Sequence, residues 1–183
     1  MKRHLMIAAT AIVSLFLTHS AQAQNFEVAG TVQFSNLQGF LANGEEVPYF
    51  AKGMGNITGM TLQIGSIRPT SPPVPVYADP QTTVLQFTGI QGTNPAFGKR
   101  QIHLLVGKGG QIHCTWEALF TITIDNATGT AVFSGDGAFT VVGGTGKYKN
   151  ATGSWQTLFE SSPTPLTEDS AMAEFDQLGN LNH

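Results

Sequence analysis

The sequence predicts an all-β protein, an antiparallel barrel of about eight strands, with a β-sandwich as the alternative. Short segments of alternating apolar and polar residues recur along the chain, and glycine- and proline-rich turns separate them. Beyond the first twenty or so residues, no segment shows a convincing helical period. Small and aromatic residues also share the predicted inner faces, which suits a narrow interior: Ala118, Gly135 and Gly137 beside Phe120, Phe133 and Phe139.

The N-terminus has the pattern of a bacterial secretion signal. Two basic residues precede an apolar run over residues 6–17, and a small-x-small sequence, Ala-Gln-Ala, follows at 21–23. The apolar run is too short to cross a membrane comfortably. We therefore expect a signal peptide over residues 1–23 and a single exported domain over 24–183, in the periplasm or outside the cell.

The composition excludes several classes of partner. Charged residues make up 11% of the chain and the formal net charge is −3, which becomes −5 if the leader with Lys2 and Arg3 is removed. A mildly acidic chain has no electrostatic attraction for nucleic acid or anionic lipid, and no later stretch is apolar enough to span a membrane. Cys114 is the only cysteine, so no intramolecular disulfide can form. Its apolar neighbours predict a buried, inert thiol.

Three strands are predicted in the N-terminal half, over residues 26–34, 56–67 and 83–90. Residues 35–53 read as a long connection whose apolar members, such as Phe40, Val47 and Tyr49, would pack over or line a barrel mouth. Residues 68–80 contain five prolines. Because proline lacks the ladder N–H, this segment should be an extended surface loop outside the central sheet.

A hairpin is predicted from residues 101–106 and 111–125, joined by a glycine-rich turn. The second arm alternates clearly, with Cys114 and Trp116 on one face and His113 and Glu117 on the other. Pairing across the turn places Val106 opposite Gln111, and hence His103 opposite Cys114. A slip of one residue would instead bring His103 and His113 together.

The stretch 133–159 reads as strand, tight glycine turn, strand. Gly143, Gly144 and Gly146 stand where a positive backbone φ is expected. Gly153 stands just inside the next strand, where the lack of a Cβ allows a bulge or a close backbone contact. After a further loop, residues 171–178 form a last strand that could close the sheet against the first.

The run over residues 141–153, Val-Val-Gly-Gly-Thr-Gly-Lys-Tyr-Lys-Asn-Ala-Thr-Gly, resembles the glycine-turn signature of the allene oxide cyclase and dirigent proteins. Many uncharacterised secreted bacterial proteins carry a similar run. The resemblance implies a calycin-like barrel of eight strands, with Tyr148 plugging one end and the turn glycines in a structural role. It also implies assembly into a homo-oligomer, which is frequent in that family.

The resemblance does not extend to catalytic residues. The Glu, Asn and Pro constellation of the plant cyclases has no counterpart on the first strand, and Arg68 and Arg100 are the only arginines of the mature chain. The catalytic residues are therefore unassigned, and whether the protein is an enzyme stays open.

The sequence gives little support for a metal site or an acid–base site. Two hairpin histidines and one thiol fall short of the three or four convergent ligands that zinc needs, so we predict no metal and no cofactor. Asp136 would be a candidate general acid if it faced inward, but its face partners Ser134 and Thr140 indicate a solvated side.

The predicted function is that of a non-catalytic exported barrel. It would bind a small hydrophobic ligand through interior aromatic residues, or serve a structural role in the envelope or outside the cell. The candidate ligand-binding residues are Trp116, Phe120, Phe133 and Phe139. The alternative is a cyclase- or isomerase-type enzyme that works by confining a hydrophobic substrate in the barrel.

Overall fold

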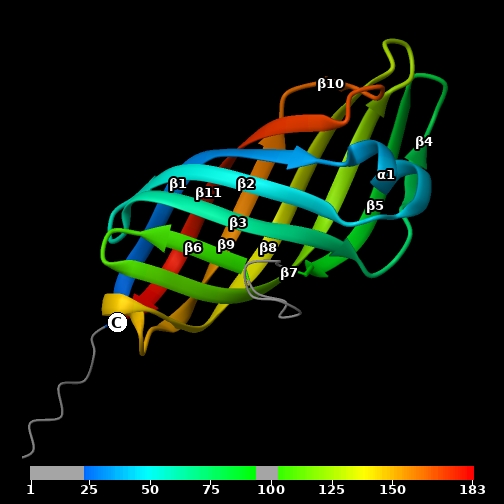
Figure 1. Ribbon diagram of the computed structural model, residues 1–183. Helices are drawn as coiled ribbons and strands as arrows, with labels where there is room; N and C mark the ends of the chain where they lie inside the picture. The colour runs from blue at the N-terminus through cyan, green and yellow to red at the C-terminus, as the bar shows by residue number, and fades with distance from the viewer. Residues whose placement is uncertain (1–22, 94–102) are drawn as a thin grey trace, which may run out of the picture.

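The computed structural model describes residues 23–93 and 103–183, and Figure 1 shows its arrangement. The predicted signal peptide, apart from Ala23, and the first two residues of the predicted 101–106 arm lie outside the described residues. The elements in chain order are β1 (Gln24–Ser35), α1 (Leu37–Asn43), β2 (Val47–Gly55), β3 (Gly59–Pro69), β4 (Val74–Ala78), β5 (Thr82–Gln91), β6 (His103–Gly107), β7 (Gly110–Asp125), β8 (Thr130–Gly144), the 3₁₀ helix η2 (Gly146–Tyr148), β9 (Thr152–Ser161), β10 (Thr164–Pro165) and β11 (Ser170–Asn182).

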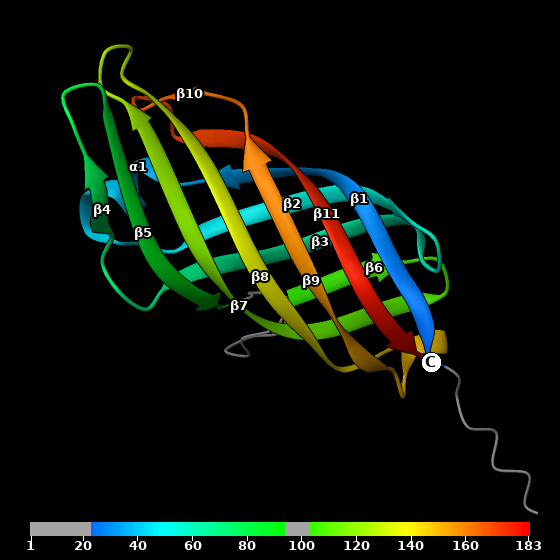
Figure 2. The same ribbon diagram turned by 180° about the vertical axis from the view of Figure 1, so that it is seen from behind.

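The described strands form one antiparallel sheet, which confirms the all-β class. Its order is β10-β8-β9-β11-β1-β2-β3-β6-β7-β5-β4. Two additional pairings, β7 with β8 and β3 with β5, bend the sheet back on itself into a partial ring. Figures 1 and 2 show the strands wrapping around a common interior, with α1 at one end and the turn between β8 and β9 at the other.

Two predicted strand pairings are confirmed. In the hairpin of β6 and β7, Val106 lies opposite Gln111 and His103 opposite Cys114. The last strand, β11, pairs along the whole of the first strand, β1. In both cases the alternating pattern specifies which face must be buried, and a slip of one residue would expose that face.

The predicted connection over residues 35–53 was wrong, because it contains α1 and β2. The helix buries Leu37 and Phe40 and ends at Gly44, whose φ of 67° reverses the chain. Two turns of helix are too short to produce a recognisable period. The second element, β2, contains Pro48 and small inward residues, which hide the strand pattern; pairing with both β1 and β3 stabilises it nonetheless.

The boundaries of two other elements also differ from the prediction. The strand expected over residues 56–67 begins only at Gly59, after a turn, and continues to Pro69. The proline-rich segment contains a short strand, β4, whose residues are all exposed. Among the described strands, β4 lies at the end of the sheet and pairs only with β5, an edge position that tolerates proline.

The expected positive φ is found at two glycines of the turn, Gly143 at 139° and Gly146 at 58°. Gly153 makes the predicted close backbone contact, because a Cβ there would overlap the backbone oxygen of Asn180. The expectation of a positive φ at Gly144 was wrong. Glycine is needed there for space, because a Cβ would overlap the backbone oxygen of Gln111 and come within 2.6 Å of that of Tyr148.

Candidate functional site

The alternation of β7 and β8 directs the predicted aromatic residues into the interior. Trp116 and Phe139 are paired across the two strands, as are Ala118 and Gly137 two residues further on. Ala118 and Gly137 are closely packed, because a Cβ at Gly137 would lie only 2.8 Å from that of Ala118. The space beside these residues is a small cavity.

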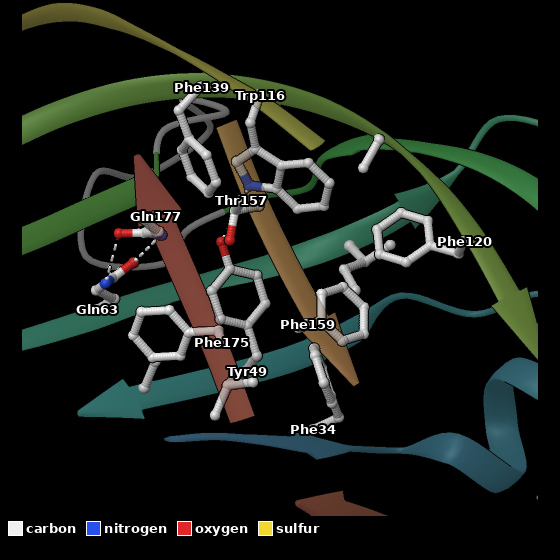
Figure 3. Close-up of a pocket in the computed structure, with 14 residues that line it drawn as sticks. Phe34, Tyr49, Gln63, Trp116, Phe120, Phe139, Thr157, Phe159, Phe175 and Gln177 are labelled. Atoms are coloured by element: carbon white, nitrogen blue, oxygen red, sulfur yellow. Dashed lines mark hydrogen bonds between the residues drawn. The ribbon is translucent and has the colours of Figure 1, made fainter. Parts of the chain in front are cut away.

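This first cavity has a volume of about 50 Å³. Seven of its lining residues are aromatic, and Figure 3 shows the polar ends of Tyr49, Gln63, Gln177 and Thr157 among them. A water needs about 10–15 Å³, whereas ligand pockets commonly exceed about 300 Å³. The interior is therefore mostly filled by its own side chains. The lining consists of Val32, Phe34, Tyr49, Ala51, Gln63, Ile67, Trp116, Ala118, Phe120, Phe139, Thr157, Phe159, Phe175 and Gln177.

A hydrogen-bonded group of three side chains, Tyr49, His103 and Trp116, borders this cavity. The Trp116 Nε1–H donates to the Tyr49 hydroxyl at 3.0 Å, and that hydroxyl lies 2.6 Å from His103 Nδ1. Because indole can only donate, the phenol hydrogen remains available for Nδ1. The neutral imidazole then carries its own proton on Nε2, which is buried and has no hydrogen-bond partner among the described residues.

Burial keeps the titratable side chains at this place uncharged, namely Tyr49, His103 and the neighbouring Cys114. Desolvation lowers the pKa of His103 to about 3. Desolvation also raises the pKa of Tyr49 far above its usual value, and the hydrogen bond from Trp116 opposes this only in part. Cys114, which is opposite His103, likewise has a pKa raised by burial. At neutral pH the three groups are a neutral imidazole, a phenol and a thiol.

A second polar feature crosses the interior between β3 and β11. Gln63 and Gln177 are both buried, and each amide N–H donates to the other amide's oxygen, at 3.1 and 3.0 Å. Figure 3 shows the two amides facing one another beside the cavity. The reciprocal pair uses one donor and one acceptor of each amide, so each retains a second N–H and a second lone pair for a small polar group.

A smaller second cavity of about 30 Å³ lies toward the α1 end. Leu37 and Phe40 of α1 line it, and it shares Phe34, Ile67, Phe120 and Phe159 with the first cavity. Among these shared residues, the Phe159 ring packs against both other rings, with its centroid 5.0 Å from that of Phe34 and 5.8 Å from that of Phe120.

The four predicted ligand-binding residues all lie in the interior. Trp116 and Phe139 line the first cavity, Phe133 lines the second and Phe120 lines both. Sequence reasoning missed Tyr49, Gln63 and Gln177. The first stood in a segment read as a connection, and the amides gave no signal beyond alternation in the strand pattern.

The other candidate residues lie away from this site. Asp136 is exposed on the outer face, as its face partners indicated, and His113 lies on that outer face opposite Leu104. Tyr148 is fully buried at the end opposite α1, where its hydroxyl donates to the Lys108 carbonyl at 3.2 Å. Within residues 23–93 and 103–183, no group of three His, Cys, Asp or Glu side chains is placed to hold a metal ion.

Among the described residues, no helix has the length and apolar character needed to cross a membrane. Searches against models of known protein families, against curated proteins and against solved structures each found no match to this chain.

Proposed function

We propose that this protein is an exported β-barrel protein that binds a small hydrophobic ligand in its interior. The observation that carries the proposal is the first cavity, which is lined by aromatic rings and a few convergent polar groups. Apolar walls with a small number of oriented hydrogen-bonding groups are typical of small-molecule sites. Trp116, Phe120 and Phe139 would contact the apolar part of the ligand, and the Gln63–Gln177 pair its polar group.

The proposed architecture is a closed, calycin-like barrel of eight strands. Its support is that each member of one set of eight pairs with two others of the same set: β1, β2, β3, β6, β7, β8, β9 and β11. Membership of the allene oxide cyclase and dirigent-like group, and assembly into a homo-oligomer, are proposed from the glycine-turn resemblance. Export is proposed from the leader pattern of residues 1–23. Light scattering on the purified protein would measure the oligomeric state.

A panel of lipids and terpenoids tests ligand binding, with native mass spectrometry and thermal melting as readouts. A ligand at a hundred times its Kd stabilises the folded state by about 2.7 kcal/mol, which raises the Tm of a domain of this size by about 5–10 °C. The Ala118→Val variant, which fills part of the first cavity, should lose this shift while keeping its fold. An empty protein with no shift across the panel would leave the envelope or extracellular structural role in its place.

A cyclase or isomerase is the second candidate, favoured by the contact between Tyr49 and His103. A phenol and a neutral imidazole joined by a 2.6 Å hydrogen bond could together donate and accept protons next to a confined substrate. Turnover of an unsaturated epoxide that disappears in the Tyr49→Phe variant, with ligand binding retained, would support catalysis. Equal rates with and without the protein would exclude it for that substrate.

A further inference from the structure

The outer face of β2 and β3 carries an apolar surface that the packing of the interior does not explain. Its outward positions between residues 50 and 64 hold five apolar side chains and one cation, Lys52. Met54 and Met60 are directly opposite one another and are 62% and 73% exposed. Contiguous apolar side chains on the surface of a folded protein mark interaction sites. This β2–β3 face consists of Phe50, Lys52, Met54, Met60, Leu62 and Ile64.

A groove of about 940 Å³ on another part of the outer surface has the opposite charge. It is lined mainly by residues of β7, β8, β9 and β11. Leu158, which is exposed, lies between Asp136 on β8 and Asp176 on β11. The groove therefore combines exposed apolar side chains with carboxylates. All the charged residues that line it are acidic: Asp136, Glu160, Glu174 and Asp176.

Two carboxylates of this groove repel one another. Glu160 on β9 and Glu174 on β11 are directly opposite, and like charges in this arrangement destabilise a sheet. Their neighbours in the same row are Ser134 on β8 and Thr31 on β1, which carry no charge. A cation that enters the groove from outside would relieve the repulsion.

The β2–β3 face and the groove lie on opposite sides of the molecule. Figure 1 shows β2 and β3 on the near side, and Figure 2, the view from behind, shows β8, β9 and β11 there. Contact between two copies through the same surface would bring like charges together. Contact between the β2–β3 face of one copy and the groove of another instead pairs opposite charges and brings apolar side chains together.

We propose that copies of this protein associate head to tail, with the β2–β3 face of one copy in the acidic groove of the next. Lys52 meets the pair of Glu160 and Glu174, and the apolar residues around Lys52 contact Leu158. Because the two surfaces of each copy lie on opposite sides, the copies extend into a chain and do not close into a dimer. This proposal rests on the proposed homo-oligomeric assembly, whose surfaces it names, and is independent of ligand binding.

Light scattering over a range of protein concentrations tests the chain. A face two strands wide gives a contact at the weak, transient end of interface sizes, so concentration has to be varied. We expect the average mass to rise continuously with concentration, because an open chain has no preferred size. The association should weaken in about 1 M salt, which screens exposed charges.

Charge reversal tests the two surfaces separately. Lys52→Glu alters the β2–β3 face, and the double variant Glu160→Lys/Glu174→Lys alters the groove. Each should self-associate at least about tenfold more weakly than the parent, since each places like charges in contact. Lys149→Glu reverses an exposed lysine outside both surfaces and should behave like the parent. Melting temperatures check that each variant is folded, and Glu160→Gln/Glu174→Gln replaces the lysine variant if that one does not fold.

An equimolar mixture of the two charge-reversed proteins should associate again, because the unaltered face of one fits the unaltered groove of the other. Variants that associate as tightly as the parent, or a mixture that does not recover association, would overturn the proposal. One fixed size at every concentration would replace the chain by a closed oligomer. A monomer at every concentration would remove the proposed homo-oligomer as well. The lipid and terpenoid panel tests ligand binding separately, so its result does not depend on any of these outcomes.

Discussion

The glycine turn between β8 and β9 and the interior polar group of Tyr49, His103 and Trp116 both contain a buried tyrosine, yet they differ in how they are built. In the turn, Tyr148 caps one end of the interior through contacts made within a short stretch of chain and with the neighbouring hairpin. In the polar group, Tyr49 of β2 meets His103 and Trp116 of the β6–β7 hairpin, which lies more than fifty residues further along the chain. The turn is held mainly by backbone hydrogen bonds, within itself and to the β6–β7 hairpin. The polar group instead depends on side chains from three strands staying in register.

The largest effect is expected in the turn, from Gly144→Val. The added side chain would collide with the backbone oxygens of Gln111 and Tyr148, which cannot move without breaking the turn. We expect the free energy of unfolding to fall by more than about 3 kcal/mol, at the upper end for overpacking. Urea denaturation measures it.

The matched control in the same turn is Lys149→Ala. This side chain is exposed, so its removal should change the stability by less than about 0.5 kcal/mol. A Gly144→Val protein as stable as the control would contradict the tight backbone packing described for the turn.

The next effect concerns the polar group, through Tyr49→Phe. Removing the hydroxyl takes away the acceptor of the Trp116 N–H and the partner of His103 Nδ1 at once. A buried group left without a partner costs about 1–3 kcal/mol, so we expect a total loss of about 2–3 kcal/mol, measured by urea denaturation. Tyr148→Phe, which removes a single hydrogen bond to a carbonyl, should cost about 1 kcal/mol. Equal losses for the two variants would mean that the two tyrosine hydroxyls contribute equally to the stability of the fold.

The two regions also differ in how far they could be predicted from the sequence. The turn could be predicted because the spacing of glycines is a local signal, although glycine is required at position 144 by backbone crowding and not by a positive φ. The β6–β7 register was visible because β7 alternates over its length with one clear interruption, the exposed Leu119. Both depend only on neighbours in the chain.

The polar group could not be predicted, because its three side chains come together only once the sheet has curved. Tyr49 lies in β2, and the proline and small residues of this strand are typical of a loop. Gln63 and Gln177 meet across the interior from strands more than a hundred positions apart, and nothing near either residue indicates the other. Buried polar pairs of this kind are set by tertiary packing, and local sequence patterns carry no trace of them.

The smallest of these effects is a pH dependence that only the polar group should show. In the folded protein the pKa of His103 is lowered to about 3 by burial, whereas an unfolded histidine titrates near about 6.5. Between these values the unfolded state binds the extra proton and the folded state does not. The stability is therefore full above about pH 6.5 and falls by about 1.4 kcal/mol for each pH unit below it, or about 2 kcal/mol at about pH 5.

His103→Gln tests this, because glutamine is neutral and retains an acceptor for the Tyr49 hydroxyl. Urea denaturation of the parent and the variant at about pH 7 and about pH 5 should show a smaller loss in the variant, by about 2 kcal/mol. Other carboxyl and histidine groups titrate equally in both proteins, so the difference between the two losses isolates His103. Tyr148→Phe leaves His103 in place and should retain the parent's loss. If the parent and His103→Gln lose the same stability, His103 is not held neutral in the interior, and the proton arrangement described for the Tyr49 group is wrong.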